Sequence, residues 1–180
     1  MSIGHVLLGV LAAGPAHGYE LKREHDQRFP SAKPLAFGQV YATLARLERD
    51  GLVEVAESSQ GGGPERTTYA LTAAGQQALA DWLADPEPAG PYPADDLVRK
   101  TVTALSTGTD AAGFLQRQRQ RHLQRMRELF ALQQQTDDAG ARIAIDHVIS
   151  HLDADLRWLK AAADRIAREQ AAHSAAERRS

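Results

Sequence analysis

The clearest pattern of apolar and polar positions lies in residues 37–50. Val40, Leu44 and Leu47 are spaced by four and then three residues, so they share one face of a helix. The remaining side is mostly polar and carries Gln39, Thr43, Arg46 and Arg49. We predict a helix over residues 38–50 that packs one face on a core and leaves the other free for a ligand.

The residues after this helix predict a β-hairpin and a further helix. Gly51 suits the left-handed conformation that often ends a helix. Apolar and polar residues then alternate in residues 53–57 and 67–71, with Gly61 to Pro64 between them as a turn. Thr72 suits the N-cap of the next helix. This order is typical of a winged helix-turn-helix, for which duplex DNA is the leading ligand.

Two more helices are expected before residue 37. Apolar residues recur at helical spacing in residues 3–13 and stop at Gly14-Pro15. A second helix begins near His17 and approaches Phe29, because Pro30 disfavours helical geometry at the residue before it. Three helices, a hairpin wing and the helix that begins at Thr72 would then occupy residues 1–84.

The second half of the chain is expected to be helical. Residues 85–95, DPEPAGPYPAD, predict a Pro-rich linker. Residues 96–172 predict a short helix, a long helix to about Gln135 and a last helix. Residues 173–180 carry no apolar stripe, and we expect them to be disordered. The predicted fold class is therefore mostly α, with an N-terminal winged helix-turn-helix and a C-terminal helical dimerisation domain.

The last helix carries an apolar repeat of 3.5 residues, which indicates a partner helix. We call it the heptad seam; its members are Ile145, Ile149, Leu152, Leu156, Leu159, Ala163 and Ile166. A DNA reader of two half-sites gains from two-fold symmetry, which favours the seam as a homodimer contact. Packing on the preceding helix of the same chain is the alternative.

Composition narrows the function. The chain has no cysteine, so thiolate metal sites and disulfides are excluded. Its longest apolar stretch, residues 6–13, is far below the roughly 20 residues of a membrane span. With no charged and apolar leader, we expect a cytoplasmic protein without a membrane partner. Residues 1–84 carry more acidic than basic side chains, so DNA affinity must depend on clustered charges and specific fit.

Other constellations favour ordinary structural roles. His147, His151 and Asp155 share a helix face with metal-ligand spacing, but they flank the heptad seam where polar side chains normally coat a helix. Arginines at alternating positions in residues 117–127 spread around a helix, which favours a solvated surface over a second DNA site. No nucleophile with its base, metal motif or cofactor fingerprint is present, so we expect neither an enzyme nor a cofactor.

Four segments resemble the PadR family of bacterial transcriptional regulators over roughly the first 85 residues. They are HGYELK (17–22), GQVYATLARLERDGLV (38–53), GGPERTTYALTAAG (62–75) and ALADWL (78–83). The resemblance implies a C-terminal dimerisation region and phenolic or multidrug-like effectors. Ala42 stands where the family often has proline, and Glu65 stands where the wing is often basic, which weakens wing contact with phosphate.

The expected DNA contacts follow from the predicted helix, its entry and the wing. They are Lys33, Gln39, Tyr41, Thr43, Arg46, Arg66 and Thr67. Tyr41 is placed there by the resemblance, with a position at the edge of the core as the alternative. Arg46 could instead pair with Asp50 one turn on. An aromatic wall for an effector is expected from Tyr92, Phe130 and Trp158, although Trp158 could simply pack on another helix.

Together these features predict a dimeric repressor that binds an inverted-repeat operator and is released by a small aromatic effector. One alternative is a MarR-like regulator, with helices on both sides of the winged domain forming the dimer. Another is a winged-helix protein-interaction module without DNA binding, which the acidic balance of residues 1–84 permits.

Overall fold

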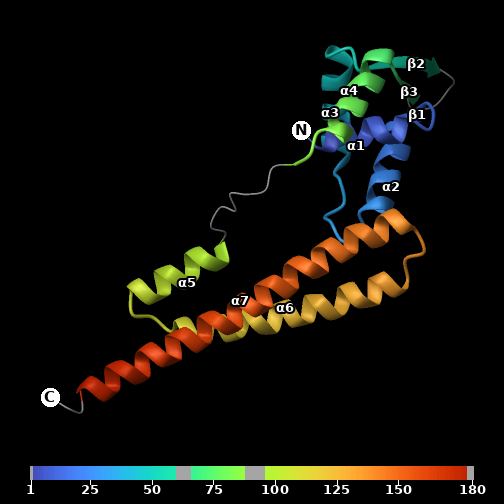
Figure 1. Ribbon diagram of the computed structural model, residues 1–180. Helices are drawn as coiled ribbons and strands as arrows, with labels where there is room; N and C mark the ends of the chain where they lie inside the picture. The colour runs from blue at the N-terminus through green and yellow to red at the C-terminus, as the bar shows by residue number, and fades with distance from the viewer. Residues whose placement is uncertain (1, 60–65, 88–95, 178–180) are drawn as a thin grey trace. The chain divides into compact units, whose positions relative to one another are not determined.

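The structure is a computed structural model that describes residues 2–59, 66–87 and 96–177. The chain divides into two compact units, an N-terminal unit of residues 1–89 and a C-terminal unit of residues 90–180. The described part is mostly helical and contains a small antiparallel sheet, which confirms the predicted fold class (Figure 1).

The N-terminal unit has the predicted order of elements with one addition. It contains α1 (Ser2–Leu11), β1 (Ala16–His17), α2 (Gly18–Arg28), α3 (Phe37–Arg49), β2 (Val53–Ser59), β3 (Arg66–Leu71) and α4 (Ala73–Ala84). As the spacing predicts, Val40, Leu44 and Leu47 are buried. They join Leu7, Leu8, Val10, Leu11, Leu21, Leu35 and Val53 in one hydrophobic core.

The sheet has the strand order β1-β3-β2, with both pairs antiparallel. β2 pairs with β3 from Val53↔Leu71 to Ser59↔Arg66, with an irregularity between Val55 and Glu57. These two strands are the expected wing, whose tip at residues 60–65 lies outside the described residues. β1 was not predicted, because two residues are too few to show an alternating pattern.

Thr72 joins the end of α3 to the start of α4. Its hydroxyl donates to the carbonyl of Gly51 at 2.7 Å and accepts from the N–H of Gly75 at 3.0 Å. Gly51 has φ of 72°, the left-handed conformation expected at this helix end. Gly75 allows a close approach, since a Cβ there would collide with the Leu52 carbonyl oxygen. The wing is thereby fixed to the helical core.

The C-terminal unit consists of α5 (Asp96–Ser106), α6 (Ala111–Gln134) and α7 (Ala139–Glu177). α6 and α7 pack side by side as an antiparallel pair (Figure 1). Asp110 caps α6 by accepting the Gly113 N–H at 2.7 Å, and Asp138 accepts the Ala141 N–H at 2.7 Å at the start of α7. α7 continues to Glu177, so the expected tail of residues 173–180 begins within this helix.

The heptad seam packs within its own chain. Leu159 and Ile166 form a buried cluster with Ala111 and Leu115 of α6, and Ile145 is fully buried. The other members, Ile149, Leu152, Leu156 and Ala163, are half-buried. Packing within the chain, the alternative that the sequence left open, thus accounts for the most buried positions of the seam, and a homodimer contact at its half-buried members stays a prediction.

None of the helices in the described ranges is long and apolar enough to cross a membrane.

Candidate nucleic-acid interface

The side of α3 that faces away from the core is exposed to solvent. We call it the open face; its residues are Gly38, Tyr41, Ala42, Ala45 and Arg49. Three of the five are small, so the helix backbone lies close to the surface along most of this face. Arg49, which the sequence placed on the polar side of the helix, belongs to this open face.

Thr43 does not reach the open face, contrary to expectation. It is 8% exposed, and its hydroxyl donates to the Gln39 carbonyl at 2.7 Å. The cause is α1, which covers this flank of α3: a Cβ built at Gly4 would lie 3.9 Å from Thr43 Cγ2 and 3.5 Å from Arg46 Nη2. Gln39 is exposed at the edge of the same flank, and Arg46 is half-buried.

Tyr41 lies on the open face with 50% of its surface exposed. Its ring packs over the start of α2, where a Cβ at Gly18 would lie 2.8 Å from Tyr41 Cε1. The absence of a side chain at Gly18 therefore makes room for the ring. Nearby, burial raises the pKa of Tyr69, and the charges of Glu48 and Tyr41 add to the shift.

Two exposed aromatic residues, which the sequence analysis did not single out, lie beside the open face. Tyr19 of α2 and Phe37 of α3 stack with ring centroids 6.0 Å apart and planes 16° apart. They are 60% and 45% exposed. The Lys22 ammonium lies 5.4 Å from the centroid of the Phe37 ring. The signal in the sequence was an aromatic residue in the first turn of each of two helices, but the pairing depends on how those helices cross.

Asp26 fixes the connection that leads from α2 into α3. Its carboxylate lies 2.6 Å from Lys22 Nζ, accepts the Leu35 N–H at 3.0 Å and lies 3.1 Å from His25 Nδ1. Burial alone would raise the pKa of Asp26, but the hydrogen bonds from Lys22, Leu35 and His25 outweigh it and hold that pKa below its ordinary value. Lys33, an expected DNA contact, is exposed on this connection.

His17 joins the start of α2 to the wing. Its backbone N–H donates to Glu20 Oε2 at 2.9 Å, as in a capping box. Its ring Nδ1 lies 3.2 Å from the Thr67 carbonyl oxygen and 3.2 Å from the Thr68 hydroxyl. Thr67 itself is half-buried on β3. Arg66 pairs with Ser59 through the backbone, and its side chain lies outside the described residues.

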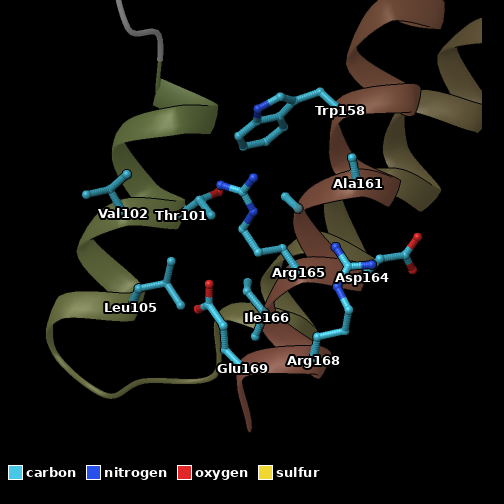
Figure 2. Close-up of a pocket in the computed structure, with 11 residues that line it drawn as sticks. Thr101, Val102, Leu105, Trp158, Ala161, Asp164, Arg165, Ile166, Arg168 and Glu169 are labelled. Atoms are coloured by element: carbon cyan, nitrogen blue, oxygen red, sulfur yellow. The ribbon is translucent and has the colours of Figure 1, made fainter. Parts of the chain in front are cut away.

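The expected effector residues do not come together in the described structure. Trp158 lines a groove of about 610 Å³ between α5 and α7, in which Val102 and Leu105 form the opposite wall (Figure 2). Arg165 extends from α7 into the same groove (Figure 2). Phe130 is exposed elsewhere on α6 and does not line it. Tyr92 lies outside the described residues.

Asp155 pairs with a histidine of the neighbouring helix. Its Oδ2 lies 3.3 Å from Nε2 of His122, whose Nδ1 is 3.0 Å from the Gln118 carbonyl oxygen. His147 and His151 meet edge to face at 4.4 Å between centroids. In the part of the chain that the structure describes, no three His, Asp or Glu side chains are arranged to hold a metal ion.

The winged-helix residues match a known family, the transcriptional regulator PadR-like family, over residues 7–81. Two curated relatives align with the chain. A probable transcriptional regulator of Mycobacterium tuberculosis, Rv1176c, is 28% identical over 115 residues, which are 63% of this chain and 61% of the relative. The negative transcriptional regulator PadR of Bacillus subtilis is 31% identical over 107 residues, 57% of either chain. The aligned region thus spans about three fifths of each relative.

Solved structures share the fold over most of the chain. Bacillus subtilis PadR in complex with operator DNA has a TM-score of 0.74 at 20% identity, covering 92% of this chain and 99% of its own. The same protein in complex with p-coumaric acid has a TM-score of 0.75 at 18% identity, with equal coverage. Residues 7–81 are thus similar to the transcriptional regulator PadR-like family, and these solved structures share the fold over most of the chain.

Proposed function

We propose that this protein is a sequence-specific DNA-binding transcriptional regulator, not an enzyme, and that α3 enters the major groove of its operator. The observation that carries the proposal is the open face of α3, which a winged-helix core presents to solvent. Both curated relatives are described as transcriptional regulators, and Bacillus subtilis PadR has a structure in complex with operator DNA. Such a protein would act in the cytoplasm, beside the DNA.

The chemistry of the open face fits close contact with bases. Gly38, Ala42 and Ala45 carry little or no side chain, so the helix can lie deep in the groove. Tyr41 would reach a base edge or a phosphate, and Arg49, 73% exposed at its side chain, would meet a phosphate. Of the side chains expected earlier, Gln39 and Lys33 are exposed and remain proposed contacts.

The remaining expected contacts are either buried to some degree or part of the wing, so we propose other roles for them. Arg46 lies on the flank that α1 covers, so it would reach the phosphate backbone rather than a base. Arg66 and Thr67 belong to the wing, which we propose follows the neighbouring backbone or minor groove. Thr43 is buried, so we assign its hydroxyl to the helix backbone and not to DNA.

We further propose that the regulator acts as a homodimer and a repressor. Several large apolar side chains of the C-terminal unit are exposed, namely Val102, Leu105, Phe130, Ile143 and Trp158. A second copy would remove such surface from water and give the two recognition helices the symmetry of an inverted repeat. The described role of PadR as a negative regulator supports repression.

A small aromatic or phenolic compound is our proposed effector. Its support is the groove beside Trp158, together with the complex of Bacillus subtilis PadR with p-coumaric acid. A ligand between α5 and α7 would change how α5 is held. If α5 contributes to the dimer, the spacing of the recognition helices would change with it, and differential affinity for the two arrangements would couple ligand to DNA.

Fluorescence anisotropy with DNA from immediately upstream of the gene tests the main proposal. Ala42→Glu places a carboxylate on the open face, where it would face phosphates and base edges. We expect affinity to fall by roughly 5- to 150-fold, which corresponds to the 1–3 kcal/mol of a recognition-helix contact. Ala154→Glu is the matched control, since Ala154 is an exposed helical alanine of α7.

The salt dependence of binding separates the main proposal from its alternative. A regulator that contacts phosphates should lose affinity steeply as salt rises. Equal DNA affinity of the Ala42→Glu and Ala154→Glu variants would mean that the DNA interface does not include the open face. Failure of the wild type to bind any upstream fragment at low or high salt would favour a protein-interaction module.

A further inference from the structure

Phe37 is the first residue of α3, and its large apolar side chain is 45% exposed. It is absent from the hydrophobic core of the N-terminal unit, so core packing does not account for an aromatic residue at this position. It stacks instead on Tyr19, which is exposed as well. Two rings at a solvent-exposed surface thus hold each other in a defined arrangement.

The neighbouring polar residues restrain this arrangement further. Lys22 lies over the Phe37 ring, and its ammonium is held 2.6 Å from Asp26. The same Asp26 carboxylate binds the N–H of Leu35, two positions before Phe37. The ring and the backbone that leads to it are therefore both anchored on α2. A side chain ordered before binding loses little entropy when it makes a contact.

The place of Phe37 on α3 indicates what it would contact. In helix-turn-helix proteins, the N-terminal residues of the recognition helix meet base edges in the major groove. A phenyl ring offers no hydrogen bond. The 5-methyl group of thymine is the apolar group that a base pair presents there, and phenylalanine is one of the side chains that contact it. Cytosine presents an amino donor instead, which an apolar ring would leave unpaired.

We propose that Phe37, held by Tyr19 and Lys22, contacts the 5-methyl group of a thymine in the operator and sets the preference for thymine at that position. The inference rests on the proposed function, because it needs α3 in the major groove. It adds a specificity-determining residue that lies outside the residues expected from the sequence.

Operator DNA with deoxyuridine in place of thymine tests the inference, since it lacks the 5-methyl groups and pairs in the same way. The protected fragment from footprinting is made in both forms, and dissociation constants are measured by anisotropy. Replacing the critical thymine alone should weaken wild-type binding about fourfold, because burial of one methyl group contributes about 0.8 kcal/mol to the binding free energy. Single replacements then locate that thymine.

Phe37→Ala should weaken binding to the thymine form and remove the difference between the two forms. The salt slope should stay unchanged, because no charge is lost. Leu83→Ala is the control: Leu83 is a 70% exposed apolar residue of α4 in the same unit, and its truncation should preserve the difference. Phe37→Gln, in which an amide replaces the ring, should also abolish it and serves if truncation disturbs the fold.

The outcomes separate this inference from the proposed function. Wild type that binds both forms equally, or a Phe37→Ala variant that keeps the full difference, would overturn the role of Phe37 while DNA binding stands. If the thymine methyl groups do not affect affinity through Phe37, the exposed aromatic pair would instead be a candidate contact for a protein partner. Absence of any DNA binding by the wild type would refute the proposed function and the inference with it.

Discussion

The carboxylate of Asp26 and the backbone N–H of Leu35, nine residues apart in sequence, are joined by a hydrogen bond of 3.0 Å. Leu35 is buried in the core of the N-terminal unit and lies just before α3. The bond therefore fixes how the chain enters the helix that we propose reads DNA. Because Asp26 also binds Lys22, one carboxylate connects α2 to this entry.

Asp26→Asn should destabilise the protein in a pH-dependent way. Despite burial, hydrogen bonds hold the pKa of Asp26 below its ordinary value. A carboxyl group with a lowered folded-state pKa stabilises the fold fully above its unfolded pKa of about 3.9, and this contribution is lost as pH falls through the lower, folded-state value. The variant should lose roughly 1–3 kcal/mol of unfolding free energy at neutral pH.

Urea unfolding at neutral and acidic pH measures this effect. The gap between Asp26→Asn and wild type should narrow below the unfolded pKa. Asp81→Asn is the control, since Asp81 is an exposed residue whose side chain binds Gln77. A gap that is the same at neutral pH and well below the unfolded pKa would show that the ionised carboxylate is not the stabilising form.

Alanine substitutions at Gly75 and Gly38 should have opposite effects on the free energy of unfolding. At Gly75 a Cβ would collide with the Leu52 carbonyl oxygen and lie 2.8 Å from Leu71 Cδ1, so Gly75→Ala should cost about 1–3 kcal/mol. At Gly38 nothing lies within 4 Å of the added atom. Gly38→Ala should therefore stabilise α3 by up to about 1 kcal/mol.

Gly38→Ala also tests the depth of α3 in the groove. If the helix lies close to the bases at Gly38, the added methyl group should weaken DNA binding while thermal unfolding shows a more stable protein. Unchanged binding would mean that Gly38 does not approach the DNA closely. Gly75→Ala, checked at a temperature where it stays folded, should retain binding.

Val102→Glu should convert the proposed dimer to a folded monomer. Val102 of α5 is 58% exposed, and a carboxylate there would be buried without a partner on association. Substitutions in the heptad seam are a poorer test, because Leu152 and Leu156 are already half-buried within the chain. Sedimentation with circular dichroism gives the readout. Leu83→Glu, at a 70% exposed position of α4, should remain dimeric. A dimeric Val102→Glu would move the contact away from α5.

An aromatic acid such as p-coumaric acid should quench Trp158 fluorescence and weaken operator binding in proportion to its occupancy. Trp158→Phe should remove the quenching, whereas Trp82→Phe should keep it. Trp82 belongs to the N-terminal unit, where it stacks on His5 with centroids 4.9 Å apart, and it does not line this groove. By linkage, operator DNA should weaken ligand binding by the same factor. Aromatic ligands that bind without changing operator affinity would make the groove incidental.

The two faces of α3 show where prediction from sequence succeeds and where it ends. The spacing of Val40, Leu44 and Leu47 identified the buried face, because helical periodicity is a local property. It did not reveal that α1 covers the flank with Thr43 and Arg46, since that depends on how two helices pack. The stacking of Tyr19 on Phe37 depends on a helix crossing in the same way.

The heptad seam illustrates a second limit. A 3.5-residue repeat indicates that a helix packs on another helix, but it does not show whether that helix belongs to the same chain. Here α6 supplies the contacts at Leu159 and Ile166. The helix ends were more predictable: Gly51 and Thr72 take the roles expected of them, because capping is a local interaction.

The length of α7 has a consequence for its dynamics. The helix has 39 residues and α6 has 24, so at 1.5 Å per residue α7 is longer than α6 by about 20 Å. Every residue from 167 to 172 is exposed. Helical turns without a packed face are marginally stable on their own. Amide hydrogens near Ile145 and Leu159 should therefore exchange slowly and those beyond Ile166 quickly, giving a gradient of protection along one unbroken helix.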